Sequence, residues 1–293
     1  MFDSYHRYDY AVCTQCDLVF QTPTPSNEEI ASFYPSHYEV YDEESKQKHI
    51  SKWRKSNLKI HYGYSHLKTN WLFDFICMVF TKENKQDELP YNPHATLLDI
   101  GSGNGRYLEG MKKLGWHTKG VEFNEGAVKV CKSSGLDVHH GDLFSAKFES
   151  NSIDITHLSH VIEHLPNPAQ FFAEVARILK PGGIFLLKTP NSNALGRALL
   201  SVNWYANDVP RHLFIFSEKN LKVLAESHGF VVESIYTRSS PKIFLNSIDY
   251  ALKNTGTPSK RIKWRRWLAK LYVLWAQHRK QGDEINMRLR KRQ

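Results

Sequence analysis

Residues 96–106 read TLLDIGSGNGR, and this stretch decides how the rest of the 293-residue chain is interpreted. An apolar run carries Asp99 near its end and then breaks into Gly101, Gly103 and Gly105. This order predicts a buried strand, a tight turn and the start of a helix. Glycines allow the backbone to pass close beneath a ligand, and the N–H groups that begin the helix can bind its polar end. The stretch is therefore the first candidate for a binding site.

The spacing of the glycines distinguishes two cofactors that use this geometry. A dinucleotide fingerprint requires G-x-G-x-x-G, and the position of its third glycine is occupied by Arg106. The pattern Asp99-x-Gly101-x-Gly103-x-Gly105 instead resembles the first motif of class I S-adenosylmethionine-dependent methyltransferases. For this motif taken alone, a glycine turn with a purely structural role is the alternative.

Acidic residues follow the next two expected strands. Residues 119–123, KGVEF, carry Glu122 near their end, seventeen residues after Gly105, where a mononucleotide-binding fold places its ribose-binding carboxylate. The expected strand at 136–140 leads into Asp142, and in the family this acid meets the adenine amino group.

Later motifs extend the resemblance to residues 96–239. They are a strand at 152–160, the run VIEHLPNP, an amphipathic helix at 168–179 and a Pro-Gly-Gly break before a strand at 184–187. The resemblance implies an α/β, Rossmann-like class I methyltransferase fold, with a mostly parallel seven-stranded sheet, an antiparallel last strand and helices on both faces. It also implies S-adenosylmethionine as cofactor. The residues expected to bind it are Asp99, Gly101, Ser102, Gly103, Gly105, Glu122, Phe123, Asp142, Leu143 and Ser159.

The net charge of +9 is concentrated near the C-terminus, because residues 259–293 hold twelve Lys and Arg against two acids. We find no apolar stretch of membrane-spanning length, no signal-peptide core at the N-terminus and, with four cysteines, no disulfide framework. These features predict a cytoplasmic protein.

The first fifty residues contain Cys13-x-x-Cys16, which can supply two of the four ligands of a structural zinc site. His6 and His37 are the histidines that could complete it. Some similar methyltransferases carry a zinc ribbon with two such pairs ahead of the catalytic domain, and here only the second half matches. Either the site has decayed or the protein starts upstream of Met1.

The chain is expected to divide into five segments. They are an N-terminal extension at 1–50, a helical segment and linker at 51–94, the catalytic core at 95–239 with a substrate lid at 189–213, a basic amphipathic helical insertion at 240–282, and the last strand and tail at 283–293. The lid is expected to be irregular, the stripe at 71–79 to pack on the core, and residues 284–290 to form an edge strand.

The insertion carries an apolar stripe at helical spacing among basic residues. Its members are Trp264, Trp267, Leu268, Leu271, Tyr272 and Trp275. Three interpretations are open: packing on the domain or on a second copy, peripheral contact of residues 259–280 with the anionic inner surface of a membrane, and binding to nucleic acid. The sequence does not indicate an oligomeric state.

Two groups of residues are candidates for catalysis. His160, Glu163 and His164 follow the fourth strand at i, i+3 and i+4, so on a helical turn they could act as a base or hold a divalent metal at the acceptor site. Their alternative is a structural role beside the cofactor. Arg211 and His212 lie in the lid, where a histidine could take a hydroxyl proton and an arginine could orient a phosphate or carboxylate. Their alternative is an ion pair between Arg211 and Asp208.

Nucleic-acid bases are argued against as acceptors. The fourth strand lacks the Asn/Asp-Pro-Pro-aromatic motif used on base amino groups, and no cysteine lies near it to attack a pyrimidine ring. We therefore expect O-methylation of a hydroxyl on a small molecule, a lipid-linked intermediate or a glycan. Carbon methylation of a sugar or quinone-like ring, and a non-catalytic cofactor-binding or membrane-recruiting protein, are the alternatives.

Overall fold

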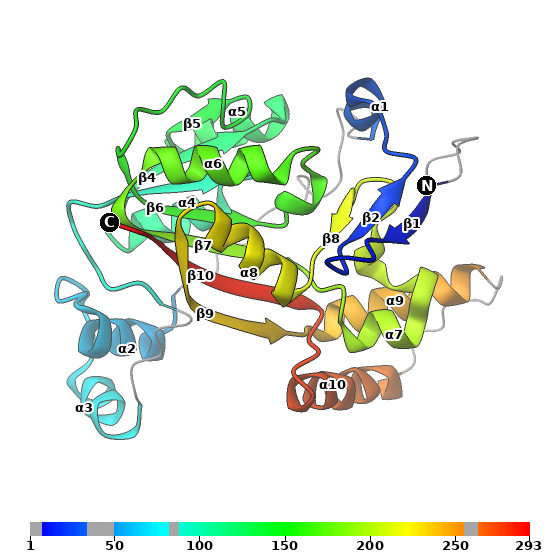
Figure 1. Cartoon of the computed structure of the whole chain (residues 1–293). Coiled ribbons are helices and arrows are strands. Elements are labelled where there is room, and N and C mark those ends of the chain that lie inside the picture. The colour runs from blue at the N-terminus through cyan, green and yellow to red at the C-terminus, as the bar shows by residue number, and fades with distance from the viewer. Residues whose placement is uncertain (1–7, 34–49, 82–87, 255–262) are drawn as a thin grey trace. The chain divides into compact units, whose positions relative to one another are not determined.

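The computed structural model describes residues 8–33, 50–81, 88–254 and 263–293. Its main element is a seven-stranded sheet with the order β5-β4-β3-β6-β7-β10-β9 (Figure 1). Neighbouring β3, β4 and β5 run parallel, and the last strand, β10, is antiparallel to β7 and β9. The strands are β3 Thr96–Ile100, β4 His117–Glu122, β5 Val138–His140, β6 Ile153–Ser159, β7 Leu179–Pro190, β9 Phe230–Arg238 and β10 Glu284–Lys291. The predicted mostly parallel sheet with an antiparallel last strand is confirmed.

The chain forms two compact units. One consists of Met1–Pro35, Leu158–Arg177 and Pro181–Gln293, and the other of Ser36–His157 and Ile178–Lys180. Residues 8–33 of the expected N-terminal extension thus belong to the same unit as the C-terminal half, and residues of the expected core belong to both units. The division follows contacts in space, whereas the predicted segments follow composition along the chain.

The unit that contains β3, β4 and β5 carries helices formed by capped amphipathic segments. In α5, for example, the Asn124 side chain accepts a hydrogen bond from the Ala127 N–H, while Val128 and Cys131 face the core. The helices of this unit are α2 Lys52–Tyr62, α3 Trp71–Phe80, α4 Arg106–Lys113 and α5 Glu125–Ser133.

The other unit has its core where Phe172 of α6, Phe185 of β7 and Phe230 of β9 meet, with ring centroids 5.5–6.0 Å apart. A capping box of Ser217 and Asn220 begins α8. The helices of this unit are α1 Asn27–Ser32, α6 Pro168–Ile178, α7 Leu195–Leu200, α8 Glu218–Ser227, α9 Pro241–Asn254 and α10 Lys263–His278, with short 3₁₀ turns η2 Ile162–His164, η3 Ser201–Asn203 and η4 Tyr205–Asn207.

A second sheet joins the start of the chain to the region after the expected lid. Its order is β1-β2-β8, formed by Asp9–Val12, Val19–Thr22 and Phe214–Ile215. The segment at 189–213 is only partly irregular, because α7, η3 and η4 occupy residues 195–203 and 205–207, and Trp204 between them is buried. Its lid function stays a prediction.

Two expectations about the elements are wrong, namely the edge position of the last strand and the place where α6 ends. Strand β10 is not an edge strand, because β7 and β9 pair with its two sides, and its alternation reflects burial of Ile285, Met287 and Leu289. The Pro-Gly-Gly run does not separate α6 from the next strand. Helix α6 ends at Ile178, whose carbonyl accepts the Ser152 N–H, and β7 begins at Leu179 and includes the run.

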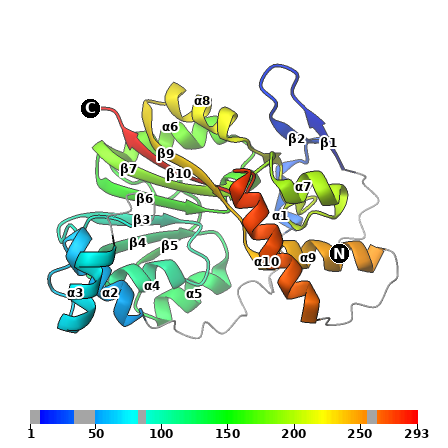
Figure 2. The same cartoon turned by 90° about the horizontal axis from the view of Figure 1, so that it is seen from below.

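The insertion between β9 and β10 is helical, as predicted, and α9 and α10 pack against each other (Figure 2). The members of its apolar stripe differ in burial, since Tyr272 is buried whereas Trp267, Leu271 and Trp275 are exposed. Helix α10 buries Arg265, Ala269, Tyr272 and Ala276. The small side chains of the two alanines allow neighbouring elements to approach the helix closely. Its exposed face carries Trp267, Leu271, Leu274 and Trp275.

Helix α3 does not bury the stripe that the sequence assigned to the core. Cys77 is its buried residue, and the side chains that remain exposed are Trp71, Leu72, Phe75, Met78, Val79 and Phe80. Its contact is with α2, where Lys59 pairs with Asp74 at 2.9 Å. Among the described residues, no helix is long and apolar enough to cross a membrane.

Candidate active site

The glycine turn after β3 is fixed by one buried carboxylate. Glu122 is the last residue of β4, and its Oε2 accepts the Gly103 N–H at 2.7 Å while its Oε1 accepts the Asn124 N–H at 2.8 Å. Gly105 has a φ of +76°, and a Cβ there would lie 2.4 Å from Leu136 Cδ1. The turn therefore requires glycine at this position.

Asp99 is also buried, at the end of β3, and its Oδ1 lies 2.6 Å from Nδ1 of His157 on β6. The ring of His157 stacks on Tyr107 of α4, with the centroids 3.8 Å apart. Sequence reasoning missed both partners. The signal for His157 was a polar residue within the apolar run of β6.

The other expected cofactor residues differ in exposure. Phe123 and Asp142 are exposed, and Asp142 Oδ1 accepts the Ser145 N–H at 2.6 Å, whereas Leu143 is buried. Ser159 ends β6. Ser102 is buried in the glycine turn, and its Oγ has no hydrogen-bond partner in the described part of the chain. A buried carboxylate, an unsatisfied hydroxyl and a close-approach glycine turn fit a polar cofactor such as S-adenosylmethionine.

Glu163 is the centre of a second group, in the other unit, and its side chain is 0% exposed. Its Oε2 accepts a hydrogen bond from Thr189 Oγ1 of β7 at 2.9 Å, and its Oε1 lies 3.3 Å from His160 Nδ1 and 4.0 Å from His212 Nε2. Burial alone would raise the pKa of Glu163. Its interactions with His160, and with His164 and His212, lower the pKa by more than burial raises it, so the carboxyl group is ionised.

His164 and His212 form a pair of edge-to-face rings with centroids 4.7 Å apart. Nδ1 of His164 lies 3.0 Å from the Arg211 carbonyl oxygen, and Nδ1 of His212 lies 2.8 Å from that of Ala206. Because a carbonyl only accepts, each Nδ1 carries a hydrogen and Nε2 is the acceptor atom of each neutral ring. Burial and the neighbouring His164 lower the pKa of His212 to about 4. His212 is 6% exposed, whereas His164 is partly accessible.

The expected helical arrangement of His160 and His164 is wrong. His160 has a φ of +56° and precedes the single 3₁₀ turn η2, so the two rings do not share a helix face. His160 Nε2 lies 2.8 Å from Glu284 of β10, which also pairs with Lys188. Burial lowers the pKa of His160, but Glu163 and Glu284 raise it to about 9, so this histidine is a cation.

Arg211 forms the ion pair with Asp208 that was its alternative role. Its guanidinium charge is therefore compensated within the protein. The loop that carries these residues is held by Tyr10 of β1, whose Oη lies 2.7 Å from the Asn207 carbonyl oxygen and 2.9 Å from that of His212. No pattern in the sequence indicated Tyr10.

Metal ligands are brought together at one place in the described residues. Ligand atoms of Glu163, His164 and His212 lie within 4.8 Å of one another, and no such group of three includes Cys13 or Cys16 there. The two cysteines lie in the turn between β1 and β2, and backbone N–H groups of Cys16 and Gln15 lower the pKa of the Cys13 thiol. His6 and His37 lie outside the described residues.

Comparisons with known proteins agree with this geometry. Residues 80–235 match the profile of the family described as a methyltransferase domain. A ubiquinone biosynthesis O-methyltransferase of Maricaulis maris is 27% identical over 198 residues, which are 64% of this chain and 72% of that protein. A Mycolicibacterium smegmatis protein with the name "Probable S-adenosylmethionine-dependent methyltransferase" is 32% identical over 142 residues, 47% of this chain and 52% of that protein.

A further ubiquinone biosynthesis O-methyltransferase, from Hahella chejuensis, is 32% identical over 36% of this chain and 48% of its own length. The chain therefore spans about half the length of two of these three relatives. Among solved structures, a chain in a Haloferax volcanii complex of a methyltransferase with its activator matches with a TM-score of 0.51 at 17% identity, covering 70% of this chain and 85% of that one. Together with the glycine turn and its acidic partners, the family match shows that this chain belongs to the class I S-adenosylmethionine-dependent methyltransferases.

Proposed function

We propose that this methyltransferase transfers the methyl group to a hydroxyl oxygen of its acceptor, with His164 as the general base. The observation that carries the proposal is the hydrogen bond between His164 Nδ1 and the Arg211 carbonyl, which makes Nε2 the proton-accepting atom of a partly accessible ring. The names of two relatives, both ubiquinone biosynthesis O-methyltransferases, support oxygen as the methylated atom.

When bound, S-adenosylmethionine supplies a methyl group already activated on a sulfonium. The residues of this chain then have three tasks: to hold the acceptor in line, to exclude water and to take the hydroxyl proton. His164 takes the proton at Nε2, and the imidazolium that results is stabilised by the Arg211 carbonyl and by the ionised Glu163. Thr189 keeps the Glu163 carboxylate in place through Oγ1. His212 is neutral and buried, so it shapes the site beside the base.

The test is transfer of labelled methyl from S-adenosylmethionine into fractionated extract of the source cells and into phenolic and sugar hydroxyl compounds. His164→Asn removes the base, and we expect turnover to fall by roughly 10²–10⁴-fold with cofactor affinity unchanged. His94→Asn, an exposed histidine before β3, is the matched control. Full turnover of His164→Asn on an identified acceptor would refute the proposal that His164 is the general base.

The position of the label distinguishes the alternatives. Label on oxygen supports the proposal, whereas label on carbon of a sugar or quinone-like ring replaces it. Partition into the organic phase indicates a lipid-linked acceptor, and label in the carbohydrate fraction indicates a glycan. Cofactor binding with no transfer to any fraction would favour the non-catalytic alternative.

A metal-assisted route is the second candidate, because Glu163, His164 and His212 can present three ligand atoms to one divalent ion. A bound cation would lower the pKa of the acceptor hydroxyl in place of a base. Metal analysis of the purified protein separates the sites. Loss of metal in His212→Asn would support the acceptor-site metal, and loss of zinc in Cys13→Ser would support a zinc site at Cys13 and Cys16. A metal-free active enzyme would exclude both.

We also propose peripheral contact of the predicted segment 259–280 with an anionic membrane. Helix α10 has no acidic residue, and Arg266 and Lys270 are exposed beside its apolar face of Trp267, Leu271, Leu274 and Trp275. The measurement is co-sedimentation with vesicles containing anionic lipid. Trp267→Ala with Trp275→Ala should weaken binding, and Trp71→Ala in α3 tests the other exposed apolar helix. Equal binding to neutral and anionic vesicles, or none at low salt, would contradict the proposal.

A further inference from the structure

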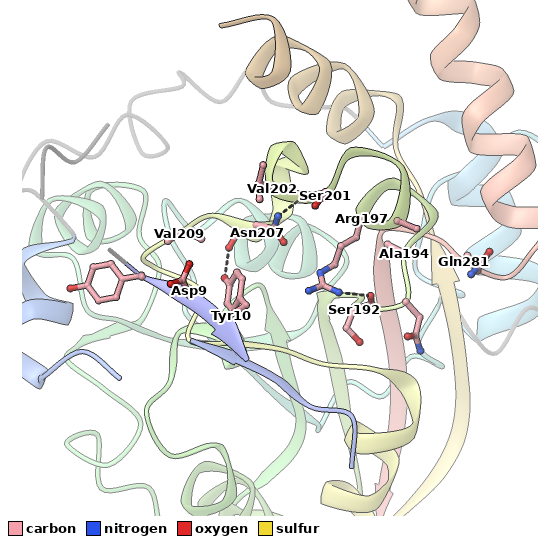
Figure 3. A pocket seen from close by; sticks show the side chains of 13 residues that line it. Asp9, Tyr10, Ser192, Ala194, Arg197, Ser201, Val202, Asn207, Val209 and Gln281 are labelled. Carbon is pink, nitrogen blue, oxygen red and sulfur yellow. Dashed lines mark hydrogen bonds between the residues drawn. The ribbon is translucent and has the colours of Figure 1, made fainter. Parts of the chain in front are cut away.

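A pocket of about 800 Å³ lies in the unit that contains β1, α7 and η4 (Figure 3). It is formed by Asp9 and Tyr10 of β1, by the residues that follow β7, by Arg197 of α7 and by the stretch from Ser201 to Val209. These are segments of the expected lid together with β1, the outer strand of the sheet β1-β2-β8. Neither the glycine turn nor the two histidines line this pocket.

Arg197 brings an uncompensated positive charge to the pocket. Its Nη1 donates a hydrogen bond to the Ser192 carbonyl oxygen at 3.3 Å, and its buried Nε has no hydrogen-bond partner in the described part of the chain. Burial lowers the pKa of Arg197, although a guanidinium stays charged at neutral pH.

Other arginines of the same unit differ from Arg197. Arg211 pairs with Asp208, Arg265 with Asp249 and Arg288 with Glu233. Within the described residues, no carboxylate forms an ion pair with Arg197, although Asp9 lines the same pocket and the phenol of Tyr10 raises the pKa of Arg197 slightly against the effect of burial. A half-buried guanidinium without a counter-charge is costly, and a bound anion would remove that cost.

Asn207 supplies a hydrogen-bond acceptor to the same pocket. It is 7% exposed, its Nδ2 donates to the Ser201 carbonyl oxygen at 2.8 Å, and its Oδ1 has no hydrogen-bond partner in the described part of the chain. A buried carbonyl oxygen left in this way matches a hydroxyl or N–H donor of a ligand. Ala194, Ala198, Val202 and Val209 provide the apolar part of the wall.

We propose that this pocket binds an oxyanion carried by the methyl acceptor, held by Arg197, with a hydroxyl or N–H group of the acceptor on Asn207 Oδ1. The inference rests on the proposed function and adds the substrate class: acceptors that carry a phosphate or a carboxylate. Arg197 thus takes the role that the sequence assigned to Arg211. Binding a part of the acceptor that does not react supplies energy for positioning the part that does.

The pocket and the histidine pair share one loop. Tyr10, which lines the pocket, lies within hydrogen-bond distance of the carbonyl oxygens of both Asn207 and His212. An acceptor that contacts Asn207 therefore contacts the segment that sets the position of the His212 ring. The pocket and the His212 ring thus share the backbone segment that Tyr10 holds.

The first test is binding without turnover. Phenyl phosphate, benzoate and the neutral analogue phenol are titrated into the full-length protein by calorimetry. We expect one of the anions to bind with an affinity that falls as salt rises, and phenol to bind at least tenfold more weakly. Arg197→Met should lower the affinity for the anion at least tenfold, and Arg197→Lys should lower it less. Arg177 is an exposed arginine of α6, and Arg177→Gln should leave the affinity unchanged. Binding of phenyl phosphate indicates an acceptor that carries a phosphate, and binding of benzoate indicates one that carries a carboxylate.

Equal affinity of Arg197→Met and the unaltered protein for both anions would overturn the inference, and so would a labelled product that carries no charge at pH 7. Arg197→Lys retains the charge and serves if Arg197→Met does not fold. His164→Asn separates this inference from the proposed function. It should bind the anion normally while its methyl transfer falls by roughly 10²–10⁴-fold, so failure of the base proposal and failure of the pocket proposal give different results.

Discussion

The glycine turn after β3 and the histidine loop at 204–212 lie in different units and are held in different ways. Gly103 is bonded to Glu122, nineteen residues later in the chain, across two adjacent parallel strands. In the histidine loop, the carbonyl oxygens of Asn207 and His212 accept hydrogen bonds from Tyr10, which is 197 and 202 residues away in the chain. Trp204 of the same loop donates a hydrogen bond to Asp283, 79 residues away. The first site is local in sequence, and the second exists only after the chain has folded.

The difference explains which substitutions should affect which function. A change in the turn removes cofactor contacts and should leave the loop in place. A change in the partners of the loop should impair stability or turnover while the cofactor still binds. Substitutions of Trp204, Glu122 and Tyr10 test this separation, and a substitution of Glu233 tests an ion pair outside both sites.

The largest effect is expected for Trp204→Ala. Trp204 is 1% exposed, and its Nε1 donates to Asp283 Oδ1 at 3.0 Å, an atom that also accepts a hydrogen bond from Tyr272. Loss of the ring leaves a cavity, and the free energy of unfolding should fall by roughly 3–5 kcal/mol. The measurement is denaturant unfolding. Tyr205→Ala, a change to the more exposed neighbouring ring, should cost clearly less; equal losses would show that the Trp204 site is not special.

Glu122→Ala should abolish most cofactor binding. It removes the acceptor of the Gly103 and Asn124 N–H groups and the carboxylate expected at the ribose. Because a hydrogen bond to a charged group contributes roughly 1.5–3 kcal/mol, the affinity for S-adenosylmethionine should fall on the order of 100-fold by calorimetry. Glu125→Ala, an exposed acid three residues later, is the control. Unchanged cofactor affinity in Glu122→Ala would contradict the assigned turn.

Tyr10→Phe should reduce turnover by about fivefold, since one hydrogen bond of roughly 1 kcal/mol holds the backbone of the histidine loop. Cofactor affinity should not change, because Tyr10 and the glycine turn belong to different units. Tyr8→Phe, on the residue two positions earlier, is the comparison. A parallel loss of cofactor affinity in Tyr10→Phe would break the distinction between the two sites.

The smallest effect concerns Glu233 of β9, which pairs with Arg288 and Arg290 of β10. Burial alone would raise the pKa of Glu233, but the two arginines outweigh burial and bring the pKa below its ordinary value. The ion pairs therefore stabilise the fold above the unfolded pKa of about 4.3 and are lost as the pH falls through the lower folded value. Glu233→Gln should lose about 1 kcal/mol at pH 7, and the difference should shrink in unfolding experiments below pH 4. A constant difference at all pH values would indicate a packing effect.

Much of the fold was predictable because its signals are local. The strand, turn and helix around Gly101 and Gly105, the amphipathic α6 and the Ser217 cap of α8 each depend on periodicity or on a few adjacent residues. The stripe on α3 shows the limit of this reasoning. Its spacing indicated a buried face, but burial depends on whether another element covers it, and α2 covers only the side of Cys77.

The candidate catalytic site was predictable in its residue types and not in their arrangement. Glu163, His164 and His212 were named from two separate motifs, and the structure brings their ligand atoms within 4.8 Å. His160 was placed with them by helical spacing, but the backbone at His160 has a positive φ and its ring pairs with Glu284 of β10. The position of β10 beside β7 could not be derived from spacing.

The sequence by itself determined the family and the cofactor, because a glycine turn with acidic residues at the ends of successive strands is a pattern of neighbouring residues. It also determined that the last strand is antiparallel and that a helical insertion precedes it. Only the tertiary structure decided that Arg211 is compensated by Asp208, that Arg197 faces a pocket, and that Tyr10 holds the histidine loop. The physical reason is that a charge or a hydrogen-bonding group acquires its role from the partners that folding brings to it, and those partners lie far away in the chain.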